Sequence, residues 1–438
     1  MSNQRPLFEE NAFPRQDLLE SILAPANLNR AWKRVKANGG AAGMDGMSLA
    51  AFPAFARQNM PRIVTWLREG RYKPAPVKRV WIPKPDGSLR PLGVPTVLDR
   101  VIQQAIAQVL APLFEPDFSE HSYGFRENRR AHDALAHLSQ AAQQGYRWAV
   151  DCDLKSFFDT VNHDRLIHQL RGKITDRGVL RLIGKYLRAG VRLPDGTTEP
   201  TARGVPQGGP LSPLLANVML DPLDHQIEAM GLPFARYADD FLILTRSQDE
   251  ALAALAKVRE VVEGTLKLIV NEDKTKVARL PECDFLGFNL RGKRIRRSTK
   301  AAQRFKDRIR EITSRSRGLS MRQRIVELQR YCLGWFHYFK VGLSYAEALH
   351  WDQWIRRRVR LCHWKDWKRP GTRRKRLLEL GTDPAEVHLA TRSRKGYWRM
   401  SSHRIVQQAL DYPYLKSLGL PSLRELWIAF KYGHQAKT

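Results

Sequence analysis

Two adjacent aspartates, Asp239 and Asp240, lie in the stretch "FARYADDFLILTRS", which covers residues 234–247. The apolar run that follows them at once is typical of a buried strand, so both carboxylates lie where that strand begins. A hairpin turn is the simplest explanation, because aspartate is common in turns. A metal site is the alternative, and the rest of the chain has to supply further ligands for it.

Candidate partners lie upstream in "AVDCDLKSFFD", where Asp151 and Asp153 are two residues apart and therefore share one face of a predicted strand. In two-metal phosphoryl transfer, carboxylates from separate strands hold two ions about 3.5–4 Å apart. Mg²⁺ uses few protein ligands, because waters and substrate phosphates complete its shell. Asp153 at a strand end, together with the Asp239–Asp240 pair at a hairpin, is thus chemically sufficient for a two-metal site. We expect Asp239 rather than Asp240 to be the main ligand, since adjacent strand residues face opposite ways.

The charge of the chain points to a polyanionic partner. Its 438 residues include 74 Lys and Arg against 44 Asp and Glu, a formal net charge of +30, which is too basic for most enzymes of neutral substrates. Residues 291–380 hold 27 of the basic residues and 7 of the acidic ones. Aromatic residues interleave with this charge, so one helix face can pack indoles while another binds phosphates. This region is predicted to bind nucleic acid; its aromatic residues include Trp335, Phe336, Tyr338, Trp351, Trp354, Trp364 and Trp367.

Size and residue usage narrow the class of protein. An apolar content of 43% is enough for a large core and for two or three domains. No apolar run approaches the length of a membrane span, and the first residues lack the layout of a signal peptide. The four cysteines form no C-x-x-C pair, so neither a zinc knuckle nor a disulfide framework is expected. A reducing bacterial cytoplasm, with association to the nucleoid, is the expected location.

The elements that must position the carboxylates follow an irregular order of strands and helices, which predicts an α+β fold rather than a doubly wound sheet. The turn signal "KPDGS" divides two alternating runs near residues 77–95, and "RWAVDCD" reads as a strand before a turn and a helix. The paired aspartates lie between two short strands. Helices are expected over residues 1–75, 96–113, 249–268 and from 299 onward, after a Gly-rich loop in "GVPQGGPLSPLLANV" that leads into a helix and a last hairpin in "CDFLGFNLRGKRIRR".

Ordered motifs give the chain a specific resemblance. It resembles a group II intron-encoded reverse transcriptase, also called a maturase. The likeness covers nearly the whole chain, and this many motifs in order make coincidence implausible. The blocks are "AAGMDGMS", "WIPKPDGSLRPLGVP", "HSYGFRENRRAHDAL", "DCDLKSFFDTVNHDRL", "GVPQGGPLSPLLANVML", "RYADDFLIL", "LIVNEDKTKV" and "FLGFNL", followed by the thumb-like "LQRYCLGWFHYF" and "RRRVRLCHWKDWKRP".

This resemblance implies a right-hand polymerase with fingers, a palm containing an antiparallel sheet, and a helical thumb. Many relatives end in a DNA endonuclease module with paired cysteines and histidines. This sequence has no such pairs and resembles the short class that lacks the module, so cutting of target DNA is not expected. The expected regions are an N-terminal extension with the start of the fingers (1–75), fingers and palm (76–290), a basic thumb or maturase domain X (291–380) and a small DNA-binding-like region (381–438).

By the same resemblance, Asp153, Asp239 and Asp240 are the catalytic carboxylates that bind metal. The backbone carbonyl of Leu154 is expected to contact a metal as well. The implied cofactor is a pair of Mg²⁺ ions, for which Mn²⁺ is a substitute.

The incoming nucleotide is expected to meet five side chains. Phe158 falls at the position of the family's steric gate, where an aromatic ring leaves no room for a 2′-hydroxyl; an ordinary core phenylalanine is the alternative. Lys84 and Arg90 flank the "PDGSL" turn and could close on the triphosphate, with a solvated turn as the alternative. Gln207 would contact the incoming pair or the template. Lys274 would lie near the pyrophosphate, and a surface lysine is the alternative there.

Two functions follow from the resemblance. The first is an RNA-directed DNA polymerase that binds group II intron RNA, assists its splicing and copies it into DNA during retromobility. Its partners would be the intron RNA, an RNA template with a DNA primer, dNTPs and target DNA, but no membrane. The second is a splicing maturase that serves mainly as an RNA-binding scaffold. A domesticated reverse transcriptase in DNA repair or phage defence is a further alternative.

Overall fold

The computed structural model describes residues 17–83, 87, 89–292 and 294–433. The chain divides into two compact units, Met1–Cys283 and Asp284–Thr438, and each is described by itself. Both units contain strands as well as helices, in no regular alternation, so the α+β fold expected from the sequence is confirmed.

The centre of the first unit is a four-stranded sheet in the order β6-β7-β3-β8. It consists of β6 (Phe234–Tyr237), β7 (Asp240–Thr245), β3 (Trp148–Asp153) and β8 (Lys276–Arg279), and all neighbouring strands are antiparallel. Phe241 to Leu244 are buried, as their apolar run predicts. The antiparallel sheet of the expected palm is therefore present, and its register places Asp153 opposite Asp240.

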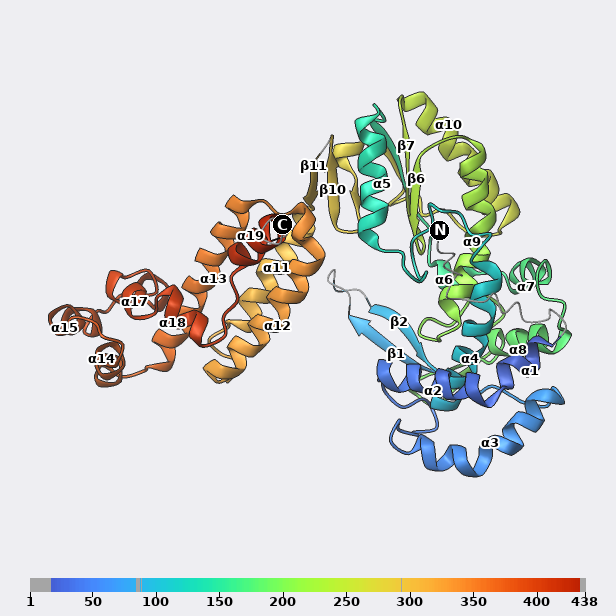
Figure 1. Ribbon diagram of the computed structural model, residues 1–438, viewed down its shortest axis with the longest axis horizontal. Helices are drawn as coiled ribbons and strands as arrows, with labels where there is room; N and C mark the ends of the chain where they lie inside the picture. Colours follow the sequence, from blue (N-terminus) through green and yellow to red (C-terminus); the bar gives the residue numbers. More distant parts are fainter. Residues whose placement is uncertain (1–16, 84–86, 88, 293, 434–438) are drawn as a thin grey trace, which may run out of the picture. The chain divides into compact units, whose positions relative to one another are not determined.

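Helices pack against this sheet. Figure 1 shows α5 (Ala131–Gln143) and α10 (Gln248–Arg259) beside β6 and β7. Helix α10 begins where the side chain of Ser247 accepts a hydrogen bond from the backbone N–H of Glu250. A helix was expected to run to residue 268, but α10 changes at Glu260–Thr265 into a π-helical turn. The Gly-rich loop leads, as predicted, into a helix, α9 (Ser212–Ala229).

A second sheet has the order β2-β1-β4-β5. Its main part is the hairpin of β1 (Val77–Pro83) and β2 (Leu89–Val94), which confirms the strand pair expected near residues 77–95. The short strands β4 (Val191–Arg192) and β5 (Thr198–Glu199) extend it. The outer half of β1 is exposed, so the hairpin carries side chains that the core does not use.

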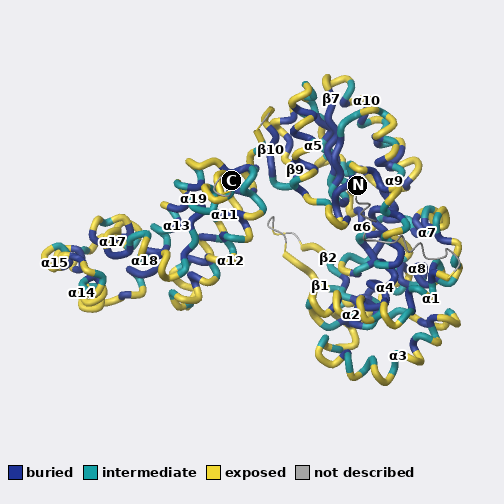
Figure 2. Tube along the Cα trace, viewed as in Figure 1, coloured by how far each residue is buried: buried dark blue, intermediate teal, exposed yellow. Residues whose placement is uncertain are grey.

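Helices complete the first unit around α4 (Val97–Phe114), which is buried along most of its length (Figure 2). The Thr96 hydroxyl caps α4 by accepting a hydrogen bond from the Asp99 backbone N–H. The apolar core of this unit includes three buried residues of α4, Ile102, Ile106 and Leu110. The remaining helices are α1 (Leu18–Leu23), α2 (Pro25–Asn38), α3 (Phe52–Arg68), α6 (Phe157–Thr160), α7 (His163–Arg171) and α8 (Arg177–Leu187).

The second unit is mainly helical, as expected from residue 299 onward. Its core centres on Phe305, whose ring stacks on Trp351 with centroids 4.6 Å apart. Several of the interleaved tryptophans are therefore core residues. The elements are β9 (Asp284–Phe285), β10 (Phe288–Arg291), β11 (Arg294–Arg297), α11 (Thr299–Ile312), α12 (Met321–Phe339), α13 (Tyr345–Asp366), α14 (Pro370–Glu379), α15 (Pro384–Thr391), α16 (Tyr397–Met400), α17 (Arg404–Ala409), α18 (Tyr412–Ser417) and α19 (Leu423–Tyr432).

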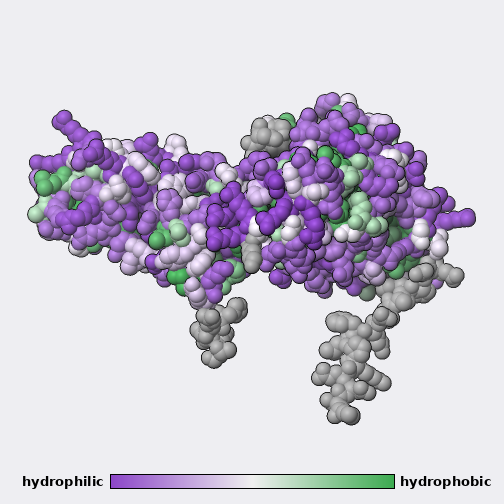
Figure 3. Space-filling view, turned by 90° about the horizontal axis from the view of Figure 1, so that it is seen from above, coloured by the Kyte–Doolittle hydropathy of each residue, from purple (hydrophilic) through white to green (hydrophobic). Residues whose placement is uncertain are grey.

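Polar and charged residues cover most of the face drawn in Figure 3. Among the described residues, no helix combines the length and the apolar character that crossing a bilayer requires.

The stability of the second unit is expected to fall in acid through His363 of α13. Its ring is buried near Trp367 and Tyr414, and burial lowers its pKa to about 4. An unfolded histidine has a pKa near 6.5. Between these pH values the unfolded chain binds a proton that the folded chain does not. The contribution of His363 to the free energy of unfolding is therefore complete above about pH 6.5 and declines by about 3 kcal/mol towards pH 4.

Urea unfolding followed by tryptophan fluorescence, from about pH 7 down to pH 4, measures this decline. His363→Phe cannot be protonated and should lose the His363 part of the acid dependence. The exposed His388, replaced by glutamine, is the matched control and should keep it. Equal pH profiles for the two variants would contradict the assignment.

Candidate active site

The paired aspartates lie at a tight turn between β6 and β7. Ala238 has a φ of +60° there, in the left-handed region that side chains rarely adopt. A loop packs directly against the turn, because a Cβ atom on Gly124 would lie 2.3 Å from the backbone nitrogen of Ala238. The backbone N–H of Tyr123 also donates to the carbonyl of Arg236 at 2.8 Å. The position of both carboxylates is thus fixed by packing as well as by the strands.

Arg236 holds this turn from inside the protein. Its fully buried guanidinium makes a bidentate ion pair with Asp224 of α9, at 2.7 and 2.5 Å. It also donates to the carbonyl of Ala238 at 2.9 Å, to Asn217 at 3.0 Å and to Ser122 at 2.7 Å. One side chain therefore ties the turn to helix α9 and to the loop beneath it.

Replacement of Arg236 by methionine is expected to lower the free energy of unfolding by about 3–5 kcal/mol, because Asp224 would remain buried without its counter-charge. Denaturant unfolding of the full chain measures the loss. The exposed Arg246, also changed to methionine, is the control and should cost no more than about 1 kcal/mol. Adding Asp224→Leu to the Arg236 variant should restore part of the stability; a further loss would contradict the pairing argument.

Asp153 at the end of β3 has its own set of partners. The side-chain amide of Asn271 donates to its carboxylate at 2.7 Å, and the ammonium of Lys274 lies 3.3 Å from the same carboxylate. Its backbone N–H donates to the Thr275 hydroxyl at 3.3 Å. Asp153 is thus oriented by the segment that leads into β8. The ammonium of Lys276, the first residue of β8, lies 3.8 Å from the carboxylate of Asp151.

The orientation of the Leu154 backbone carbonyl follows from the hydrogen bonds at the end of β3. Leu154 pairs with Val270 through two flanking hydrogen bonds, from the Lys155 N–H to Ile269 and from the Asn271 N–H to Asp153. In an antiparallel pair of this type, the middle residue turns its own N–H and C=O to the opposite side. The carbonyl of Leu154 therefore points to the side of β3 on which β7 lies.

The carboxylates repel one another in this arrangement. Burial, followed by the charges of Asp151, Asp239 and Asp153, raises the pKa of Asp240 to about 7. Burial and the charge of Asp153 also raise the pKa of Asp239. Bound divalent cations would relieve this repulsion, and carboxylate and carbonyl oxygens are the ligands that Mg²⁺ prefers. The donor types therefore fit such ions, although no three acidic, histidine or cysteine side chains among the described residues are grouped closely enough to hold one by themselves.

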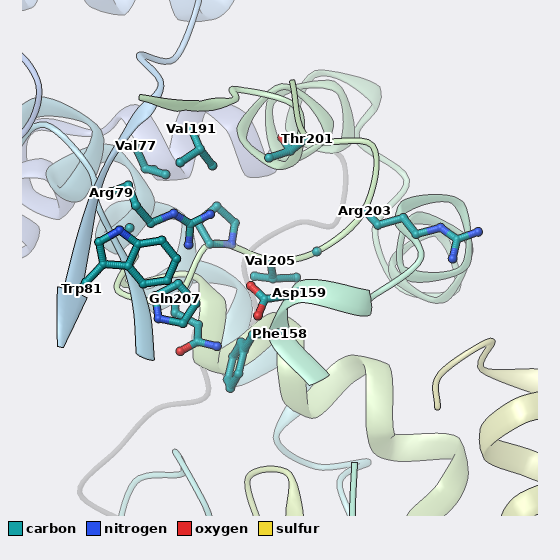
Figure 4. Close-up of a pocket in the computed structure, with 14 residues that line it drawn as sticks. Val77, Arg79, Trp81, Phe158, Asp159, Val191, Thr201, Arg203, Val205 and Gln207 are labelled. Carbon is teal, nitrogen blue, oxygen red and sulfur yellow. The ribbon is translucent and has the colours of Figure 1, made fainter. Parts of the chain in front are cut away.

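A cavity of about 280 Å³ lies between helix α6 and the β1–β2 hairpin (Figure 4). The ring of Phe158 and the side chain of Gln207 line it, together with Arg79 and Trp81 of β1. Gly204 permits this arrangement, because its φ is +95° and a Cβ atom would lie 2.9 Å from the carbonyl oxygen of Phe158. The structure thus brings two of the expected nucleotide-binding residues to one cavity.

A third expected nucleotide-binding residue, Arg90, contacts Gln207. Its Nε atom donates to the Gln207 side-chain oxygen at 2.9 Å. The next residue, Gly208, approaches β2 closely, because a Cβ atom on it would lie 2.6 Å from the carbonyl oxygen of Gly93. Lys84, predicted beside Arg90, lies outside the described residues.

Two family profiles match the chain. The profile of the reverse transcriptase (RNA-dependent DNA polymerase) matches residues 82–290, and that of the group II intron maturase-specific domain matches residues 302–381. Protein YkfC of Escherichia coli (strain K12) is 34% identical over 324 residues, which cover 64% of this chain and 84% of YkfC. The chain belongs to the group II intron reverse transcriptase and maturase family. The family expected from the ordered motifs, and its reverse transcriptase domain, are confirmed.

Two further matches cover less of the proteins concerned. The group II intron-encoded protein LtrA of Lactococcus lactis subsp. cremoris is 30% identical over 319 residues, 57% of this chain and 53% of LtrA. This chain thus spans about half the length of that relative. A solved chain of a partial Cas6-RT-Cas1–Cas2 complex is 28% identical, with 57% of this chain and 44% of that chain covered and a TM-score of 0.37.

The candidate site of this group II intron reverse transcriptase includes residues that were not singled out from the sequence. Asn271 was missed although it belongs to the "NEDKTK" block, where only Lys274 was considered. Arg236 and Asp224 were missed as well. A basic residue inside an otherwise apolar strand, such as Arg236 in "FARY", is a signal that could have identified a buried ion pair.

Proposed function

We propose that this reverse transcriptase is an RNA-directed DNA polymerase that binds group II intron RNA, assists its splicing and copies it into DNA during retromobility. The observation that carries the polymerase part is the meeting of Asp153 with the Asp239–Asp240 turn on adjacent antiparallel strands. The reaction joins the primer 3′ oxygen to the α-phosphorus of a dNTP and releases pyrophosphate.

The side chains would divide this work as follows. Asp153, Asp239 and Asp240, with the Leu154 carbonyl, would hold two Mg²⁺ ions, or Mn²⁺ in their place. When bound, such ions activate the attacking hydroxyl and stabilise the charge of the leaving group. Lys274 lies beside Asp153 and would neutralise the pyrophosphate.

The sugar and the base would be positioned in the cavity beside α6. Phe158 presents its ring there and would exclude a 2′-hydroxyl, while Gln207, held by Arg90, would contact the incoming pair. Lys84 and Arg90 would act on the triphosphate. Asp159 also lines the cavity, and we assign it a structural role.

Primer extension tests the polymerase activity. Purified protein, an RNA template, a DNA primer and Mg²⁺ should yield DNA with dNTPs and little product with rNTPs. Extension on a DNA template alone, or with rNTPs as readily as dNTPs, would contradict an RNA-directed DNA polymerase.

The maturase-specific match over residues 302–381 favours a second function, a scaffold that folds the intron RNA. The two functions separate in one experiment. Asp239→Asn should lose primer extension but retain splicing assistance on an intron RNA encoded beside the gene. The neighbouring sequence also discriminates, because flanking intron RNA domains support intron use and their absence supports a domesticated role.

A further inference from the structure

The second unit contains a cavity that shares no lining residue with the candidate active site. It lies at the carboxyl end of α11, between helices α13 and α16, and has a volume of about 680 Å³. Among the described residues, the lining of this cavity includes no acidic side chain. We call it the arginine pocket, after its lining residues Arg310, Arg315, Arg358 and Arg399, which Tyr397 and Trp398 accompany.

Hydrogen bonds hold one wall of the arginine pocket in place. Arg358 donates to the Thr313 hydroxyl at 2.9 Å and to the carbonyl of Arg310 at 3.2 Å, so it caps the end of α11. Burial lowers the pKa of Arg358, and the charges of Arg310 and Arg315 lower it further. Positive charges thus face one another across the pocket, an arrangement that an anion would stabilise.

Among the described residues, three of the four arginines of the pocket have no acidic partner, Arg358 being one of them. Arg310 pairs with Asp307 at 2.6 Å, but neither Arg315 nor Arg399 forms an ion pair with any carboxylate of the described chain. Both side chains are exposed. They are therefore available to a ligand, and a phosphate is an anion whose geometry guanidinium groups match.

An exposed indole lies at the same place. Trp398 is 41% exposed, which is unusual for a residue of this size and polarity. Arg357 supports it, with its guanidinium carbon 3.8 Å from the ring centroid and its Nη2 donating to the Trp398 carbonyl at 3.2 Å. A rigid, exposed ring beside unpaired arginines is the combination that binds unpaired nucleotides, because every base can stack and every nucleotide carries a phosphate.

We infer that the arginine pocket binds an unpaired nucleotide of a single-stranded nucleic acid, with Arg315 and Arg399 on the phosphodiester and Trp398 stacked on the base. The maturase-specific match ends at residue 381, so only part of the pocket lies within it, and Tyr397–Arg399 lie outside it. It belongs wholly to the second unit, so it does not depend on the polymerase site.

Equilibrium binding of the full chain to short unstructured oligonucleotides, RNA and DNA of the same sequence, tests this inference. Arg315→Gln combined with Arg399→Gln should make the dependence of log Kd on log salt shallower by about 0.7, because both arginines bind one phosphate and each phosphate of a single strand contributes about 0.7 to the slope. Trp398→Ala should weaken binding about 5- to 100-fold through lost stacking. The matched control, Arg322→Gln with Arg374→Gln, removes the same charge from exposed positions outside the pocket.

Photo-crosslinking locates the bound base. Oligonucleotides that carry 5-iodouracil should crosslink to the peptide containing Tyr397 and Trp398, and Arg315→Gln with Arg399→Gln should reduce the yield. Effects with both oligonucleotides would identify the shared phosphate and base as the ligand, and effects with one would identify RNA or DNA as its source. Equal losses in the pocket and control variants, or crosslinks confined to other peptides, would overturn the inference.

Discussion

Replacing Asp239 by asparagine is expected to slow primer extension on an RNA template by about 10³-fold, equivalent to about 4 kcal/mol of transition-state stabilisation. Asparagine has nearly the shape of aspartate but lacks the charge that holds a divalent ion. The turn should remain intact, because Arg236 fixes it through the Ala238 carbonyl and Asp224 rather than through Asp239.

Stability should respond in the opposite direction. The charge of Asp239 contributes to the raised pKa of Asp240, so removing it relieves repulsion between buried carboxylates. Thermal unfolding in the absence of divalent ions should therefore occur at an equal or higher temperature in Asp239→Asn. Affinity for RNA should be unchanged. This pattern separates loss of a ligand from loss of the fold.

The exposed Asp249, at the start of α10, provides the matched control. Asp249→Asn makes the same chemical change in the same unit and should leave primer extension unaffected. Retention of more than about a tenth of the extension rate by Asp239→Asn would contradict its role as a metal ligand.

The sequence predicted features that depend on neighbouring residues. The apolar run after Asp240 predicted a buried strand, and "KPDGS" predicted the β1–β2 hairpin, because strand burial and turn chemistry are local properties. The position of Asp153 at the end of its strand was predicted for the same reason. The ordered motifs then identified the family.

Contacts between distant segments could not be predicted in this way. Asn271 bonds to Asp153 across 118 residues, and Arg90 bonds to Gln207 across 117. No periodic pattern specifies which strand end meets which loop, since that depends on the whole packing of the unit. The early end of α10 is a similar case, because its apolar positions continue into the π-helical turn.

The largest effect on substrate choice is expected at Phe158. Both Phe158, 7% exposed, and Phe157, 2% exposed, belong to the core, with ring centroids 5.1 Å apart, but only Phe158 lines the cavity. Phe158→Val removes the part of the ring that would meet a 2′-hydroxyl. The preference for dNTPs over rNTPs, measured as the ratio of kcat/KM values, should fall by about 10²-fold, the scale on which one hydroxyl group is discriminated in an apolar pocket.

The neighbouring Phe157 allows a control that separates selectivity from stability. Phe157→Val creates a cavity in the core and should destabilise the unit by a few kcal/mol, on the order of a large-to-small core substitution. It should nevertheless leave the nucleotide preference unchanged, because a ratio of two kcat/KM values is independent of the concentration of folded enzyme. If the two variants altered the ratio equally, Phe158 would be a core residue whose ring does not meet the sugar; if only Phe158→Val altered it, the ring itself excludes the ribonucleotide.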